Sequence, residues 1–374
     1  MRVIRMVVAT AGIMIVLAGL VTRVSAQSEV VPFASDRWEI RAVESKVVSH
    51  LGRQSFYLKG GLAVVKDSQF VDGVIEFDLA FSTERGFLGA VWRLQDFNNY
   101  ENFYVRPHQS GNPDANQYQP VFNGDDAWQL YYGEGYGAPV KYDFEQWVHI
   151  KIAVSGKNAE VYIKDMEKPA LVVNELKRET KAGKVGLSAG NFAPAYYSNF
   201  SFDTRTPVLK GKAGATPVAP PGTVMSWQVS DVIEGKSLDK KYQLTANDKN
   251  KLQWTKLDCE ATGICNLARV HGVQGERNTV FAKLTVHSES EQTKPMALGF
   301  SDMARVYLNG RLLYAGSDAY RSRDYRFLGT VGLFDELYLP LSKGDNELLV
   351  AVSEGFGGWG IKAQFEDREG IKLF

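Results

Sequence analysis

Apolar and polar residues alternate with a period of two along most of the chain. In residues 73–81 every second side chain is apolar and falls on one face of an extended chain, whereas Glu76 and Asp78 fall on the other face. This alternation is typical of an antiparallel strand with one buried face, because successive side chains of a strand point to opposite sides. The same pattern predicts strands over residues 87–95, 100–107, 127–132, 147–154, 159–164, 184–189 and 197–202.

A second series of alternating segments follows a break in the pattern. These segments predict strands over residues 224–232, 252–257, 279–286, 296–300, 304–308, 336–341, 347–352 and 360–365. A helical period is hardly sustained anywhere, although residues 174–181 fit one or two helical turns. Many short strands separated by Gly-rich turns predict an all-β fold of β-sandwich or jelly-roll type.

The break itself predicts how the domains are arranged. Residues 206–223 are rich in Pro, Gly and Ala and poor in large apolar side chains, so they favour a flexible linker. We therefore expect two tandem sandwiches, residues 27–205 and 224–374.

The N-terminus has the pattern of a secretory signal peptide over residues 1–26. Arg2 and Arg5 precede an apolar run, and Val24-Ser25-Ala26 supplies the small residues of a cleavage site. An uncleaved membrane anchor is the alternative, since the run approaches the length that spans a bilayer. We expect cleavage and a periplasmic or extracellular location, with no stable membrane span afterwards.

Charge narrows the classes of partner. Without its first 26 residues the chain keeps 40 of its 43 Lys and Arg residues against 43 Asp and Glu residues. A basic field that would attract nucleic acid is therefore not expected. The oligomeric state cannot be predicted from the sequence.

Two cysteines occur, Cys259 and Cys265. In an oxidising compartment a disulfide between them is favoured over two free thiols. The pair alone does not predict a zinc site, because such a site needs four nitrogen or sulfur ligands.

Polar and aromatic residues on two neighbouring predicted strands favour a sugar-binding face. Alternation places Tyr104, Arg106 and His108 opposite Phe103 and Val105, and it places Arg93 and Gln95 opposite Trp92 and Leu94 on the strand before. Planar Arg and amide groups suit paired hydroxyls, and an aromatic ring suits the C–H face of a sugar. An ordinary solvated sheet face is the alternative. His108 is a weak candidate for a catalytic acid or base, with a surface role as the alternative.

The residues that follow extend this candidate site. Residues 109–124 predict a polar loop that contains Asn123 and folds over the face, and Trp128 and Tyr131 add aromatic area. Oxygen ligands around Asp125 and Asp126 raise calcium as an alternative cofactor, although no EF-hand spacing supports it. We expect no other cofactor.

Six segments together resemble a known superfamily. Residues 72–78, 92–100, 103–106, 147–154, 159–163 and 183–187 resemble, in order and spacing, the concanavalin A-like lectin/glucanase superfamily, in its laminin-G-like and keto-disaccharide-hydrolase-like (domain of unknown function 1080) branches. The resemblance implies a jelly-roll sandwich whose concave sheet often binds sugar. Residues 304–310, 341–349 and 357–360 resemble galactose-binding-like jelly rolls, which accompany catalytic domains in many glycoside hydrolases.

The resemblance leaves three functions open. Family-16-type glucanases carry a strand with Glu-x-Asp-x-(x)-Glu, and here Ala80 and Phe81 stand where the last Glu belongs, after Glu76 and Asp78. Retaining glycosidases need two carboxyl groups, so this motif is broken. We expect an exported carbohydrate-binding protein. A hydrolase or lyase that acts on keto-disaccharides or oligosaccharides, and an adhesive exoprotein that binds protein partners, remain the alternatives.

Overall fold

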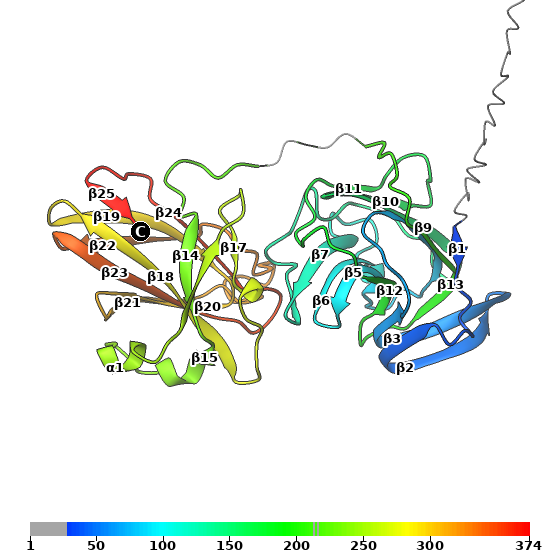
Figure 1. The fold of residues 1–374 in the computed structure, drawn as a ribbon, viewed down its shortest axis with the longest axis horizontal. Coiled ribbons are helices and arrows are strands. Elements are labelled where there is room, and N and C mark those ends of the chain that lie inside the picture. The colour runs from blue at the N-terminus through cyan, green and yellow to red at the C-terminus, as the bar shows by residue number, and fades with distance from the viewer. Residues whose placement is uncertain (1–27, 212–213, 215–216) are drawn as a thin grey trace, which may run out of the picture.

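The computed structural model describes residues 28–211, 214 and 217–374. The predicted signal peptide and residues 212, 213, 215 and 216 of the predicted linker lie outside the described residues. The described chain is almost entirely β-structure and forms two β-sandwiches that lie side by side (Figure 1). The all-β sandwich prediction is therefore confirmed. Among the described residues, no helix has the length and apolar character needed to span a membrane.

The first sandwich is one long antiparallel sheet that folds over on itself. Its elements are β1 (Glu29–Val30), β2 (Trp38–His50), β3 (Arg53–Val65), β4 (Gly73–Ala80), β5 (Leu88–Asp96), β6 (Asn99–Val105), η1 (Pro107–Gln109), β7 (Asn116–Phe122), β8 (Asp125–Asp126), β9 (Val148–Ser155), β10 (Asn158–Ile163), β11 (Leu171–Val173), β12 (Lys184–Ala189) and β13 (Ala195–Asp203). The strands pair in the order β11-β10-β9-β4-β13-β3-β12-β5-β6-β7-β8, with β1 on β13 and β2 on β3.

Strand β3 carries the sheet from one layer to the other. Residues 56–58 of β3 pair with β13, whereas residues 61–64 pair with β12. The bend between them occurs at Gly60 and Gly61. Gly60 has a φ of +65°, and a Cβ on Gly61 would lie 2.0 Å from the carbonyl oxygen of Arg41. Glycine is needed here because a side chain would clash with the neighbouring strand.

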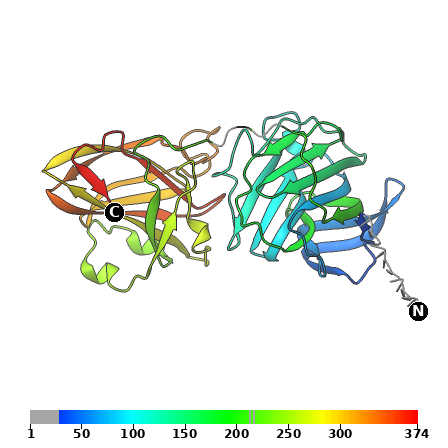
Figure 2. The same cartoon turned by 45° about the horizontal axis from the view of Figure 1, so that its top comes forward.

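The apolar faces of the regular strands fill the space between the two layers of the first sandwich, whose ribbons Figure 2 shows from a second direction. Ile75, Phe77 and Leu79 of β4 pack against the layer that contains Trp92 of β5 and Phe103 of β6. The period of two therefore sorts core from surface as the sequence predicts.

Three local predictions for the first half are wrong. Residues 116–122, predicted as part of a loop, form β7 beside β6. Residues 127–132, predicted as a strand, form a turn in which the amides of Leu130 and Tyr131 bond to the carbonyl of Ala127. Residues 174–181 contain no helical turn. The long hairpin of β2 and β3 was not predicted.

The second sandwich consists of two sheets. Its elements are β14 (Ser226–Ser230), β15 (Ile233–Glu234), η2 (Gly235–Leu238), α1 (Ala246–Lys249), β16 (Trp254–Asp258), β17 (Cys265–Asn266), η3 (Leu267–Arg269), β18 (Arg277–Ser288), β19 (Gln292–Phe300), β20 (Met303–Leu308), β21 (Arg311–Ser317), β22 (Asp335–Leu341), β23 (Gly344–Ser353), β24 (Gly360–Gln364) and β25 (Ile371–Leu373). One sheet has the order β16-β14-β18-β23-β20-β21, with β15 and β25 on β18, and the other has the order β17-β24-β19-β22.

The core of the second sandwich contains Trp359. Its indole is fully buried among Trp227, Phe300 and Val350, and its Nε1 donates to the carbonyl of Val352. Trp359 is therefore a core residue. Cys259 and Cys265 form a disulfide.

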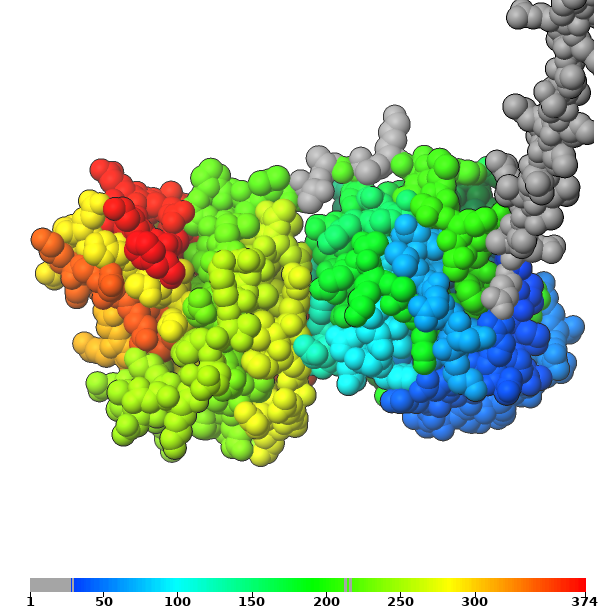
Figure 3. All heavy atoms as spheres, in the orientation of Figure 1, coloured from blue at the N-terminus to red at the C-terminus, as the bar shows by residue number. Residues whose placement is uncertain are grey.

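The two sandwiches are docked against each other, as the space-filling view shows (Figure 3). Phe122 of β7 packs with the apolar core of the second sandwich. The amide nitrogen of Gln129 donates to the carbonyl of Gly357 at 3.0 Å, and its side chain donates to the carbonyl of Leu328 at 2.8 Å. The second sandwich is thus held by direct contacts with the first sandwich as well as by the linker.

A buried ion pair also joins the sandwiches. The Nζ of Lys177 lies 2.7 Å from a carboxylate oxygen of Glu260, and both side chains are more than nine-tenths buried. Burial lowers the pKa of Lys177, but Glu260, Tyr136 and Glu175 together more than offset this and hold the pKa above its usual value. Lys177 therefore stays charged at the interface.

Candidate functional site

A groove of about 610 Å³ lies on the outer face of the layer that contains β12, β5, β6, β7 and β8. Alternation along β6 explains its position. Phe103 and Val105 point into the core, so Asn102 and Tyr104 point out into the groove. The groove is therefore on the face of β6 that the sequence predicted.

Polar groups line the floor of the groove. Asn102 on β6 lies beside Gln119 on β7, and the hydroxyl of Ser188 on β12 donates to the Oδ1 of Asn102 at 3.3 Å. The Nε2 of Gln119 donates to Asp126 at 3.0 Å. The Oε1 of Gln119 is buried and has no hydrogen-bond partner, although Gln119 lines the groove. A buried carbonyl without a donor costs about 1–3 kcal/mol, so a ligand hydroxyl or a water that reached this atom would relieve that cost.

Aromatic and apolar side chains form the walls. Phe87 and Tyr104 make an edge contact with ring centroids 5.5 Å apart, and Phe192 lies 6.0 Å from Phe87. At another part of the groove, Phe97 and Tyr100 border an apolar cluster that includes Leu62.

Two arginines also line the groove. The guanidinium of Arg41 lies 3.9 Å from the ring centre of Phe97, and that of Arg85 lies 4.7 Å from the ring centre of Phe192. Each planar cation is thus held against an aromatic wall, with its donors near the groove.

Asp126 contributes a carboxylate to the groove. Desolvation by the surrounding walls, together with the neighbouring charge of Asp125, raises the pKa of Asp126 to about 6. Its side chain remains open to the groove. Asp126 therefore accepts hydrogen bonds as an anion at neutral pH and gains a proton under mildly acidic conditions.

Of the eight residues predicted to bind ligand, two line this groove. These are Tyr104 and Trp128, both largely buried. Arg106 lies beside them without lining the groove. It pairs with Asp114 at 2.8 Å, and its guanidinium lies 5.9 Å from the ring centre of Trp128.

The prediction that Arg93 and Gln95 share this face is wrong, because β5 contains a bulge. Arg93 has a φ of +48°, and the pairing of β5 with β6 shifts between Trp92 and Asp96. The bulge turns the side chain of Arg93 to the end of the sandwich, where it is 1% exposed and donates to the carbonyls of Val71 and Gly156. The amide of Gln95 donates to the carbonyls of Arg93 and Ala182 instead.

Asn123 and Tyr131 belong to the junction of the sandwiches. The Nδ2 of Asn123 donates to the carbonyl of Ala268 at 2.8 Å, and the hydroxyl of Tyr131 donates to Glu260. Both side chains are thus committed to contacts with the second sandwich, and the structure does not place them in the groove.

His108 lies behind the groove wall. Its ring is 5.5 Å from that of Phe87, and it does not line the groove. Burial, together with the charges of Arg106 and Arg85, lowers the pKa of His108 to about 4. His108 is therefore neutral at pH 7 and has no proton to donate as an imidazolium.

Sequence reasoning missed several groove residues. Gln119 lay in a segment predicted as a loop, although the order Gln117-Tyr118-Gln119 already alternates. Phe87 already lies in the predicted strand 87–95, at the same parity as Arg93 and Gln95, but it was not named as a candidate. Phe356, from the second sandwich, also lines the groove, and no local pattern indicates this.

Glu76 and Asp78 lie on β4, away from the groove. The carboxylate of Asp78 accepts from Asn199 at 2.6 Å, contacts the Nδ1 of His149 at 2.7 Å and pairs with Arg53. Burial alone would raise the pKa of Asp78, but the hydrogen bonds from His149 and Asn199 hold it below its usual value. These contacts make Asp78 a salt-bridged strand carboxylate.

The carboxylates considered for calcium have protein partners. Asp125 accepts from the amide of Val273 at 3.1 Å, and Asp126 accepts from Gln119. No group of three His, Cys, Asp or Glu side chains within the described residues has a geometry that could hold a metal ion.

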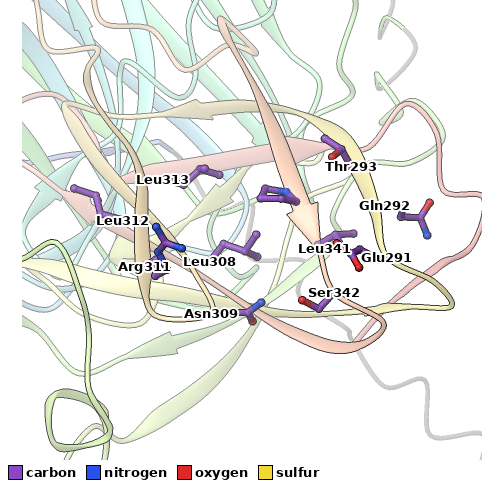
Figure 4. A pocket seen from close by; sticks show the side chains of 11 residues that line it. Glu291, Gln292, Thr293, Leu308, Asn309, Arg311, Leu312, Leu313, Leu341 and Ser342 are labelled. Atoms are coloured by element: carbon purple, nitrogen blue, oxygen red, sulfur yellow. The ribbon is translucent and has the colours of Figure 1, made fainter.

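A second hollow, of about 580 Å³, lies on the second sandwich (Figure 4). Leu308, Arg311 and Leu313 line one part of it, and Gln292 and Thr293 line another. It contains no aromatic side chain, so it offers no ring for the C–H face of a sugar. The groove of the first sandwich is therefore the better candidate site.

Comparisons with known proteins find distant likenesses. No family model matches the chain, and no curated protein matches it. The carbohydrate-binding module CBM66 from Bacillus subtilis is 16% identical, with a TM-score of 0.35 over 46% of this chain and 99% of that one. The β-glucanase of Bacillus licheniformis is 10% identical, with a TM-score of 0.35 over 48% of this chain and 99% of that one.

A third solved structure, a putative glycosyl hydrolase from Parabacteroides distasonis, is 12% identical, with a TM-score of 0.32 over 45% of this chain and 94% of that one. Likenesses at this level carry no argument about function. The galactose-binding-like character of the second sandwich stays a prediction.

Proposed function

We propose that this protein is exported and binds a glycan in the groove of the first sandwich. The observation that carries the proposal is that one groove contains both hydrogen-bond acceptors and aromatic side chains. Gln119 and Asp126 supply acceptors for hydroxyl groups, and Phe87, Tyr100 and Tyr104 supply apolar surface. A sugar ring presents these same two kinds of surface, hydroxyls at its edge and C–H groups on its faces.

Binding without hydrolysis is favoured by the count of carboxylates. Among the described residues that line the groove, Asp126 is the only Asp or Glu. Both retaining and inverting glycosidases of the common kind require two carboxyl groups across the scissile bond. The groove offers one, so it can hold a glycan but lacks the second catalytic partner.

A hydrolase remains the second candidate because of one observation, the raised pKa of Asp126. A carboxyl group with a pKa of about 6 suits a general acid. If Asp126 acts in this way, turnover of oligosaccharides should be measurable and should vanish in Asp126→Asn.

The proposal is tested by calorimetric titration of neutral and acidic oligosaccharides into the wild-type chain and two variants. Gln119→Leu removes the free acceptor, and Phe87→Ala removes one wall. Each should weaken binding about tenfold, which corresponds to about 1.4 kcal/mol. Leu313→Ala, in the hollow of the second sandwich, is the control and should bind as wild type does.

If no oligosaccharide binds wild type while a protein partner does, the glycan proposal is wrong and an adhesive role takes its place. If Leu313→Ala weakens binding and Gln119→Leu does not, the site has been assigned to the wrong sandwich.

A further inference from the structure

Aromatic rings of the second sandwich continue the wall of the groove. Phe356 lines the groove although it belongs to the loop between β23 and β24. Its ring lies 5.9 Å from that of Trp128 and 6.0 Å from that of Tyr320, and Trp128 and Tyr320 are 6.4 Å apart. The three rings, two of them from the second sandwich, therefore form one cluster, which we call the junction cluster.

The junction cluster presents open surface. Phe356 is 53% exposed and Tyr320 is 36% exposed, whereas Trp128 is 8% exposed and forms the base. An exposed Phe beside a groove loses contact with water only when something covers it. The junction cluster thus already presents an apolar surface on which a ligand could pack.

One buried residue, Asp302, holds both loops that carry the exposed rings. Its side chain accepts from the amide of Phe356 at 2.7 Å, and its carbonyl accepts from the amide of Asp318 at 2.7 Å, two residues before Tyr320. The backbones of the two loops are therefore held together before any ligand arrives, which reduces the entropy lost on binding.

The junction cluster is also fixed relative to the groove. Trp128 lies in the turn next to Gln129, and the backbone of Gln129 both donates to Gly357 and accepts from Val331. These bonds tie the turn of the first sandwich to two loops of the second. The groove and the junction cluster thus form one rigid surface.

The groove is long enough to hold more than one sugar unit of a glycan chain that reaches the junction cluster. It is lined in turn by β12, β6, β7 and β8, and β5 lies between β12 and β6. Four strand spacings amount to roughly 19 Å, which is longer than a single sugar ring. Trp128, two residues after Asp126 of β8, and Phe356 also line the groove.

We propose that Phe356 and Tyr320, which pack on Trp128, form a further subsite for an oligosaccharide. One glycan chain is then bound by both sandwiches. The inference rests on the proposed function of the groove and adds the class of ligand. That ligand is an extended chain of several sugar units, rather than a monosaccharide or a disaccharide.

The test is the dependence of affinity on chain length. Neutral oligosaccharides of two and of six units from one series are titrated into wild type, Phe356→Ala and Tyr320→Ala. Wild type should bind the six-unit sugar at least tenfold more tightly than the two-unit sugar. Phe356→Ala and Tyr320→Ala should each lose most of this difference, because their affinity for the six-unit sugar should fall much more than their affinity for the two-unit sugar.

Tyr338→Ala is the matched control, because Tyr338 is an exposed aromatic residue on β22 of the same sandwich and does not line the groove. Thermal unfolding of each variant verifies that it folds. If wild type binds both lengths equally, or if Phe356→Ala keeps the preference for the long chain, the subsite is refuted while the function of the groove stands. If wild type binds no sugar of either length, the proposed function and the subsite fail together.

Discussion

At the scale of single residues, the chemistry of the groove depends on the side to which each side chain turns. Gln119 reaches the groove because it has the same parity on β7 as Asn102, its partner on β6. Arg93 carries a side chain at least as well suited to a sugar, yet one bulge turns it into the end of the sandwich. Residue type alone therefore does not identify the site.

The pKa of Asp126 predicts how binding changes with pH. Asp126 accepts hydrogen bonds from sugar hydroxyls best as an anion, and its pKa is raised to about 6. Lowering the pH from 7 to 5 protonates most of it, so affinity should fall by up to about tenfold as the charged fraction falls. Calorimetric titration at both pH values measures the change.

Asp126→Asn is the control for this pH dependence, because an amide does not titrate in this range. Its affinity should be weaker than that of wild type at pH 7 and nearly the same at both pH values. An equal pH dependence in wild type and in Asp126→Asn would show that another group is responsible.

At the scale of elements, glycines determine where strands and loops approach each other. The Gly-rich turn before β24 lies against the turn of residues 127–131. A Cβ on Gly358 would lie 2.7 Å from the Cδ1 of Leu130, and Gly358 has a φ of +137°. This motif is rich in glycine because the first sandwich occupies the space that side chains would need.

Gly358→Val should therefore separate the sandwiches. The clash with Leu130 adds to backbone strain of about 1–3 kcal/mol, so thermal unfolding should shift downward and the radius of gyration from X-ray scattering should increase. Gly344→Val is the matched control. Gly344 also has a positive φ, of +96°, but no atom lies within 4 Å of its added Cβ. If the two variants lose equal stability and scatter alike, the glycine is required only for its φ.

At the scale of the whole molecule, the two sandwiches behave as one body. The interface contains an apolar cluster around Leu130 and Tyr131 and the buried pair of Lys177 with Glu260. The linker therefore connects two parts that are already bound to each other.

We expect the described parts of the chain to unfold in a single calorimetric transition, and Glu260→Gln to lower it. Without Glu260, the buried Lys177 loses one of its two carboxylate partners, at a cost of about 2 kcal/mol or more. Glu276→Gln is the control, because its pair with Lys236 is exposed on both sides and contributes little. Two separate transitions in wild type, with only one of them shifted by Glu260→Gln, would contradict the idea of one cooperative body.

The sequence alone determined the strands that have one face in the core and the other face outside it. Residues 73–81 and 100–107 alternate because one face meets the core and the other is turned away from it, so β4 and β6 were predicted close to their observed bounds. In β7 only residues 117–119 alternate, Pro120 follows them directly, and every residue of the strand is buried, so the segment was predicted as a loop. A segment that is covered on both sides no longer shows which side faces the core.

Only the tertiary structure decided the site. Tyr104 was predicted on the correct face because β6 is regular, but the bulge in β5 and the turn at residues 127–131 redirected Arg93 and Tyr131. The contribution of Phe356 depends on two surfaces that lie far apart in sequence and meet only after both sandwiches have folded. A sequence pattern records what each segment needs for its own burial, whereas a site between segments is set by how their folded surfaces fit together.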